Sequence, residues 1–186
     1  MNDDLNPEAL EEVQAEAQPV DEPVISDHQA QMAFETFQSE QNLMMGTIAG
    51  LIASLAGAGV WAAATIMTGY QIGFMAIGIG ILVGFAVRQM GKGLDQSFGF
   101  VAGAMSLVGC GLGNVLYITY YVADNQGMAY MDILTQLNFG IMSEMLSTTF
   151  EPMDLLFYGL AVYFGYKYAF RQITEQDLNR ALGKSM

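Results

Sequence analysis

The side chains that could carry chemistry in this sequence are few, and they are mostly hydroxyl, amide and carboxylate groups. Ser106, Cys110 and Asn114 follow one another at four-residue spacing in a run without charges, so they would share one face of a helix. Glu151 and Asp154 stand at the start of a later apolar run. Groups of this kind can replace the hydration shell of an ion. Ser106, Asn114, Glu151 and Asp154 are therefore candidates for a polar pathway, although the two acids also fit an ordinary solvated loop.

Other catalytic or metal-binding patterns are missing from the sequence. The only histidine, His28, precedes every long apolar run, so no HExxH motif and no Ser/His or Cys/His pair can form within those runs. The fourteen methionines are scattered rather than clustered as copper(I) ligands would be. We therefore expect no catalytic residue, no cofactor and no metal site. A lipid-acting enzyme is the alternative, and it would have to use charged groups near the ends of the apolar runs: Glu151, Asp154, Arg88 or Lys92.

The composition of the chain explains why so few side chains could carry chemistry. Of the 186 residues, 53% are hydrophobic and 13% are charged. A soluble domain carries about 25% charged residues, so this composition is typical of a chain embedded in a bilayer. The sequence predicts an all-α fold, a polytopic bundle of transmembrane helices.

Four apolar runs would form the spans of this bundle. A helix of about 20 apolar residues crosses the hydrocarbon core of a bilayer, which is roughly 30 Å thick. The runs cover residues of about 44–67, 71–87, 98–122 and 153–170, within a transmembrane domain of residues 44–171. Between the third and fourth runs, residues 123–151 mix acids with apolar residues at helical spacing. They predict an interfacial amphipathic helix, with a partly re-entrant helix as the alternative.

The segments that flank the transmembrane domain are polar. Residues 1–26 hold eight acids, three prolines and no Lys or Arg, which predicts a disordered acidic tail. Residues 27–43 carry apolar side chains on one side at helical spacing and predict a short amphipathic helix at the membrane surface. Residues 172–186 predict a C-terminal tail with the mixed pattern of a short amphipathic helix.

The basic residues predict the orientation of the chain. All six Lys and Arg residues lie just after the second run or from the end of the fourth run onward. Four spans would put every one of them on the same side, and an excess of Lys and Arg marks the cytoplasmic side. We therefore expect both termini in the cytoplasm and a location in the bacterial inner membrane.

Small residues recur at four-residue spacing within the first three runs. Helices in lipid associate by close backbone approach, and small side chains permit it. The pattern predicts helix-packing contacts through Gly46, Gly50, Ser54, Ala58, Gly80, Gly84, Gly99, Gly103, Gly109 and Gly113. A pore, a hinge or a dimer face would use the same residue types, but packing within one bundle is their commoner use.

Two stretches carry a family resemblance. The first comprises Gly73 to Gly78, Val87 and Arg88, Gly91 to Gly93, and Phe98 and Gly99; the second comprises Met153 to Gly159, Gly165 to Lys167, and Phe170 and Arg171. Together they resemble a family of small uncharacterised bacterial inner-membrane proteins with four spans. The resemblance covers roughly residues 44–171, outside the acidic tail, and implies the same span count and orientation. It implies no activity, because none is known for the family.

Three hypotheses for function follow. The first is a non-enzymatic accessory or scaffold subunit that lies in the lipid bilayer and recruits a protein partner through the acidic N-terminal tail. The second is a small oligomeric channel or transporter component that uses the polar pathway, in which case the chain would form a homo-oligomer. The third is the lipid-acting enzyme. A tail without positive charge excludes a nucleic-acid partner.

Overall fold

The computed structural model describes residues 26–70 and 73–183 of the chain. The acidic tail predicted for residues 1–26 and the last residues of the C-terminal tail therefore lie almost wholly outside the described residues. Within the described ranges the protein has eight helices and no strand, so the all-α prediction is confirmed. The helices are α2 (Asp27–Ser39), α3 (Leu43–Thr68), α4 (Phe74–Gly91), α5 (Gln96–Gln126), α6 (Tyr130–Leu134), α7 (Phe139–Thr149), α8 (Pro152–Tyr168) and α9 (Glu175–Ala181).

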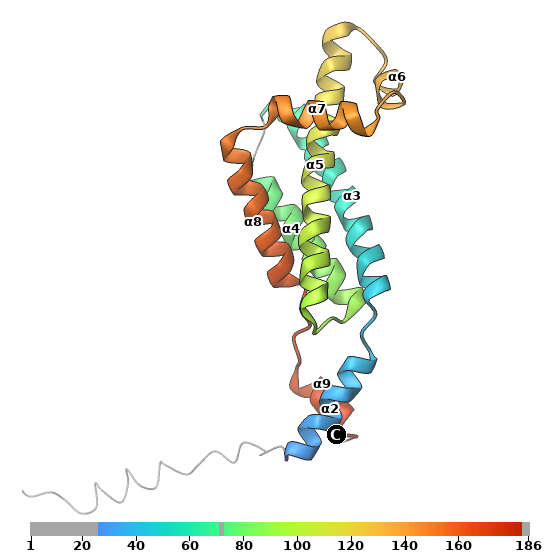
Figure 1. The fold of residues 1–186 in the computed structure, drawn as a ribbon, viewed down its shortest axis with the longest axis vertical. Helices are drawn as coiled ribbons and strands as arrows, with labels where there is room; N and C mark the ends of the chain where they lie inside the picture. Colours follow the sequence, from blue (N-terminus) through green and yellow to red (C-terminus); the bar gives the residue numbers. More distant parts are fainter. Residues whose placement is uncertain (1–25, 71–72, 184–186) are drawn as a thin grey trace, which may run out of the picture.

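Four of these helices form an antiparallel bundle. Helices α3, α4, α5 and α8 run alternately in opposite directions (Figure 1). Helices α4 and α5 pack against each other, and each also packs against both α3 and α8. At one end of the bundle α2 and α9 lie together, whereas α6 and α7 lie at the other end (Figure 1). We call these the α2/α9 end and the α6/α7 end.

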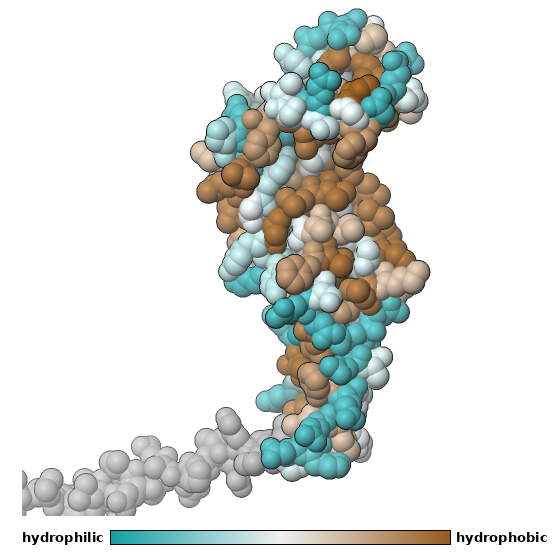
Figure 2. Space-filling model, in the orientation of Figure 1, coloured by the Kyte–Doolittle hydropathy of each residue, from teal (hydrophilic) through white to brown (hydrophobic). Residues whose placement is uncertain are grey.

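Three of the four bundle helices are long and apolar enough to cross a membrane, namely α3 with 26 residues, α4 with 18 and α5 with 31. Helix α8 has 17 residues and is therefore about 26 Å long, somewhat shorter than the hydrocarbon core of a bilayer. The outer surface of the bundle is apolar around its middle, and polar residues cover both ends (Figure 2). Large apolar side chains are exposed on different helices of the bundle, including Ile52 on α3, Phe100 on α5 and Leu155 on α8.

Single residues mark both ends of α3 and the C-terminal end of α5. Asn42 caps α3, since its side-chain oxygen accepts a hydrogen bond of 2.9 Å from the Met45 amide. Gly69 ends the same helix with a φ of 69°, a left-handed conformation that glycine adopts without strain. Gly127 ends α5 in the same way with a φ of 65°. Helix α5 therefore extends four residues beyond the predicted end of the third span at residue 122.

The segment of residues 123–151 differs from the prediction of one interfacial helix. Its first residues belong to α5, and two short helices, α6 and α7, follow. Asn138 separates them, because its extended backbone starts a new helix and its side-chain oxygen accepts the Ile141 amide at 2.9 Å. The apolar spacing of residues 123–151 continues across these breaks, which is why it predicted a single helix.

Candidate functional site

The small residues on α3 lie at its contacts with α4 and α5. A side-chain Cβ at Gly46 would be 3.2 Å from the Cα of Gly91, and one at Gly50 would be 2.8 Å from Val87. Further along α3, Ser54 and Ala58 are fully buried. Opposite them on α5, a Cβ at Gly109 would lie 3.0 Å from the Ser54 hydroxyl. The backbones of these helices therefore approach each other closely.

The partner of Ala58 on α5 is Gly113, whose added Cβ would lie 3.4 Å from the Ala58 carbonyl oxygen and 3.2 Å from the Trp61 side chain. Gly99 and Gly103 lie on the side of α5 that faces α8, where added Cβ atoms would meet Tyr166 and Val162. Every predicted packing residue on α5 thus faces a neighbouring helix.

The closest approach of two helices is between α4 and α8. A Cβ at Gly80 would collide with the carbonyl group of Ala161, and one at Gly84 would lie 2.6 Å from the carbonyl oxygen of Gly165. Gly78, on the same helix, has open space around it. Gly80 and Gly84 are therefore required for the contact with α8, whereas Gly78 is not.

The two buried residues of the predicted polar pathway, Ser106 and Asn114, form hydrogen bonds within the bundle. The Ser106 hydroxyl donates to the Ala102 carbonyl at 2.7 Å, and the Asn114 amide donates to the Tyr158 hydroxyl of α8 at 3.2 Å. Both Ser106 and Asn114 are buried in the bundle. Asn114 thus links α5 to α8, because a buried amide in a membrane bundle needs a hydrogen-bond partner.

The two acids of that pathway lie at the start of α8, at the α6/α7 end. The Glu151 amide donates to the Asp154 carboxylate at 3.0 Å, and the two residues form a capping box around Pro152. Asp154 is one helical turn before Tyr158, the partner of Asn114. Glu151 is exposed and Asp154 is half-buried, so both acids have an ordinary structural use at a helix N-terminus.

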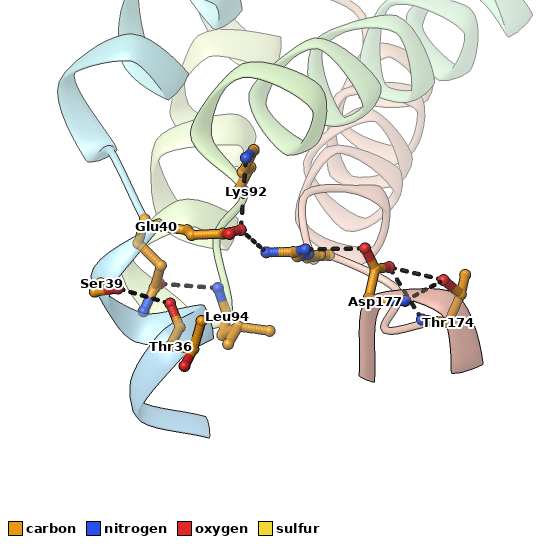
Figure 3. A network of polar contacts seen from close by, with 9 residues as sticks. Thr36, Ser39, Glu40, Lys92, Leu94, Thr174 and Asp177 are labelled. Atoms are coloured by element: carbon orange, nitrogen blue, oxygen red, sulfur yellow. Dashed lines mark hydrogen bonds and ion pairs between the residues drawn. The ribbon is translucent and has the colours of Figure 1, made fainter. Parts of the chain in front are cut away.

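The densest polar cluster of the described residues lies at the α2/α9 end, and the sequence did not single it out as a site. Arg171, just after α8, donates to the Glu40 carboxylate at 2.7 Å and to the Asp177 carboxylate at 3.2 Å (Figure 3). Lys92, at the end of α4, lies 3.5 Å from the same Glu40 oxygen. We call Glu40, Lys92, Arg171 and Asp177 the clasp.

Arg171 makes two further contacts that fix its position. Its backbone amide donates to the Gly93 carbonyl at 2.8 Å, and its guanidinium lies 4.8 Å from the centre of the Phe37 ring. The side chain is 13% exposed. One arginine therefore contacts α2, the α4–α5 loop and α9, and a planar guanidinium with five donors suits such a junction.

Two hydrogen bonds join the segment between α2 and α3 to the end of α4 and the α4–α5 loop. The Gln41 side-chain oxygen accepts from the Leu94 amide at 2.9 Å (Figure 3), and the Asn42 amide donates to the Gly91 carbonyl at 2.9 Å. The segment between α2 and α3 is therefore held against the end of the bundle rather than extended away from it.

Both carboxyl groups of the clasp have a pKa below the ordinary value. For Glu40 the main cause is the hydrogen bond from Arg171, assisted by the charge of Lys92. For Asp177 the main cause is the pair of hydrogen bonds from the Thr174 hydroxyl and amide, with a smaller contribution from Arg171. Both carboxylates are therefore ionised at neutral pH, which the ion pairs require.

No group of three or more His, Cys, Asp or Glu residues lies close enough to hold a metal ion within residues 26–70 and 73–183. The polar interactions between elements of this part of the chain include the ion pairs and hydrogen bonds of the clasp and the hydrogen bond between Asn114 and Tyr158.

Comparisons with known proteins add no relative: no family model, no curated protein and no solved structure matches this chain. The resemblance to small four-span bacterial proteins therefore stays a prediction.

Proposed function

We propose that this chain is a four-span protein of the bacterial inner membrane that acts as a non-enzymatic scaffold and presents its acidic N-terminal segment at the cytoplasmic face. The observation that carries the proposal is the clasp, because Arg171 ties α2, which directly follows that segment, to the end of the bundle. Each part of the proposal has its own support.

The proposal of a fourth span rests on the packing of α8. This helix lies alongside α4 and α5 over its length and contributes to the same apolar outer band. Lys167, in its last turn, can extend its side chain toward water while its stem stays in the apolar region, which lengthens the reach of a short span.

The proposed orientation rests on charge. Arg88, Lys92, Lys167, Arg171 and Arg180 all belong to the α2/α9 end of the bundle, whereas the α6/α7 end carries acids only within the described residues. The positive-inside rule therefore favours a cytoplasmic α2/α9 end.

The scaffold role rests on two features: the acidic charge of residues 1–26, and the attachment of α2, which follows them, to the end of the bundle. Residues 1–26 contain eight acids and no Lys or Arg, so they would attract a basic protein surface. Held by α2 close to the membrane, the segment would keep such a partner near the cytoplasmic leaflet. The channel alternative has less support, because Ser106 and Asn114 are buried and engaged in hydrogen bonds within the bundle.

The topology can be tested by the accessibility of single cysteines in a Cys110→Ala background. Cysteines at Ser26, Asp95, Gln136 and Ser185 would be treated with a membrane-impermeant thiol reagent on spheroplasts, in which the outer face of the inner membrane is open. We expect labelling at Gln136 alone until the membrane is permeabilised. Labelling of Ser26 or of Asp95, an exposed position in the α4–α5 loop, in intact spheroplasts would contradict the orientation.

The scaffold role needs a partner test with matched variants. A photo-cross-linking residue within residues 1–25 should yield one discrete adduct in cells. We expect the adduct to disappear when the eight acids of residues 1–26 are changed to their amides, and to weaken in Arg171→Leu, which would release α2. An adduct of equal yield in the amide variant would show that charge does not recruit the partner, and no adduct at all would refute the role.

A further inference from the structure

A pocket of about 350 Å³ opens beside the clasp at the α2/α9 end of the bundle. It is lined by the end of α4 and by the segment from Arg171 into α9, that is by Arg88, Gln89, Lys92, Arg171, Gln172, Thr174, Asp177 and Arg180. Four of the six Lys and Arg residues of the chain therefore line one pocket, in a protein with nineteen acids. We call it the basic pocket.

The positive charge of the basic pocket is only partly neutralised. Asp177 is the one carboxylate of its lining, and it is paired with Arg171. Arg88 and Arg180 form no ion pair with any residue in 26–70 and 73–183, and the Lys92 side chain, paired with Glu40 at 3.5 Å, is 51% exposed. The pocket therefore has room and unneutralised donors for an anion.

The basic pocket lies next to apolar surface of α4. The Arg88 guanidinium stacks 4.9 Å from the centre of the Phe85 ring, one turn further into the apolar band. Phe85 and Met90 on α4 have about half of their surface exposed. An anion in the pocket would thus have apolar surface next to it on one side and water on the other, which is the environment of a lipid headgroup.

We propose that the basic pocket binds the phosphate headgroup of an anionic phospholipid, with its acyl chains along α4. Guanidinium groups bind phosphate oxygens through paired N–H donors, so Arg88 and Arg180 suit this ligand better than lysines would. The cytoplasmic leaflet is rich in anionic lipid, and basic pockets at helix ends recognise such headgroups. This inference goes beyond the scaffold role and does not depend on a protein partner.

The test compares lipid binding to the full-length protein and to two variants. The protein would be purified in a mild detergent and mixed with phosphatidylglycerol or with phosphatidylcholine of the same chain length, and the bound lipid would be counted by native mass spectrometry. Arg88→Gln/Arg180→Gln removes the two unpaired cations, whereas Lys167→Gln removes a cation of the same end that does not line the pocket. In a parallel series, inorganic phosphate alone and phosphatidylglycerol are each added to the protein, and the thermal unfolding midpoint is measured.

We expect phosphatidylglycerol to bind in preference to phosphatidylcholine, and its affinity to fall about tenfold or more in the double variant but not in Lys167→Gln. An equal loss in Lys167→Gln, or no loss in the double variant, would overturn the proposal. So would inorganic phosphate that raises the unfolding midpoint as much as phosphatidylglycerol does, since the ligand would then be a soluble anion. If the double variant does not fold, the single change Arg180→Gln, at an exposed position, carries the same comparison.

Discussion

The interior of the bundle and the clasp at its end hold helices together by different forces. In the interior, α4 and α8 meet through Gly80 and Gly84, and no charged side chain is buried among the described residues there. At the clasp, Arg171 joins α2 to α9 through two carboxylates, and the groups involved are partly open to water. The first region depends on shape and the second on charge.

This difference predicts how each region responds to its surroundings. Close packing of small residues does not titrate, and it fails only when a larger side chain is introduced. Ion pairs near water weaken when a carboxylate is protonated or when salt screens the charges. The stability of the bundle should therefore change little with pH and salt, whereas the docking of α2 and α9 should weaken at low pH and at high salt.

The largest effect is expected from a change in the interior. Gly80→Leu would place a side chain against the Ala161 carbonyl of α8, whose backbone has no room to move without opening the bundle. We expect a loss of about 3 kcal/mol in the free energy of unfolding, at the upper end for an overpacked core. The loss would be measured by unfolding in mixed detergent micelles.

Gly78→Leu is the matched control on the same helix. An added Cβ at Gly78 meets nothing within 4 Å, so this change should leave stability within about 0.5 kcal/mol of the wild type. Equal losses in the two variants would mean that α4 tolerates no larger residue anywhere, and would contradict a specific α4–α8 contact.

A smaller effect, confined to the other region, is expected from Arg171→Leu. The change removes the hydrogen bonds to Glu40 and Asp177 and leaves both carboxylates without their cation. We expect α2 and α9 to lose protection against amide hydrogen exchange by the equivalent of about 2 kcal/mol. The amides of α3, α4 and α5 should exchange as before. Lys167→Leu, also at the end of α8, should change neither group, and faster exchange throughout the bundle in Arg171→Leu would refute the separation of the two regions.

The sequence could predict the bundle because its signals are local. The absence of charge over residues 44–67 is enough to indicate α3, and four-residue spacing of small side chains is enough to place Gly46 and Gly50 on one face. Which helix each face meets depends on the tertiary arrangement, and no short pattern encodes it. The breaks after α5 and before α7 are not predicted, because Gly127 and Asn138 act through backbone conformation while the apolar spacing continues past them.

The clasp could not be predicted from the sequence, for a related reason. Glu40 and Arg171 are 131 positions apart, so nothing in the sequence pairs them. In the sequence alone, Arg171 is one of the basic residues after the fourth apolar run, and Glu40 is one of the acids before the first run. The signal that could have been used is chain direction, since the residues before the first run and those after the second and fourth runs must lie at the same end of an antiparallel bundle, where acids and bases can pair.

The smallest effect concerns pH, and it acts on the clasp alone. The pKa of Glu40 lies below its ordinary value of 4.5 and that of Asp177 below 3.8, so each carboxylate contributes stability above these values and loses it as the pH falls through its lowered pKa. Glu40 contributes to the docking of α2 through Arg171, whereas Asp177 contributes mainly through Thr174 at the start of α9. Lowering the pH from about 6 to about 3.5 should therefore speed hydrogen exchange in α2 and α9, by less than about 1 kcal/mol because the Glu40 side chain is 34% exposed. Rates would be compared after correction for the intrinsic pH dependence of exchange.

Glu40→Gln should show weaker docking at neutral pH and a smaller change on acidification, because its amide cannot titrate. A response in Glu40→Gln as large as in the wild type would assign the pH dependence to other acids and leave the clasp without a role in it.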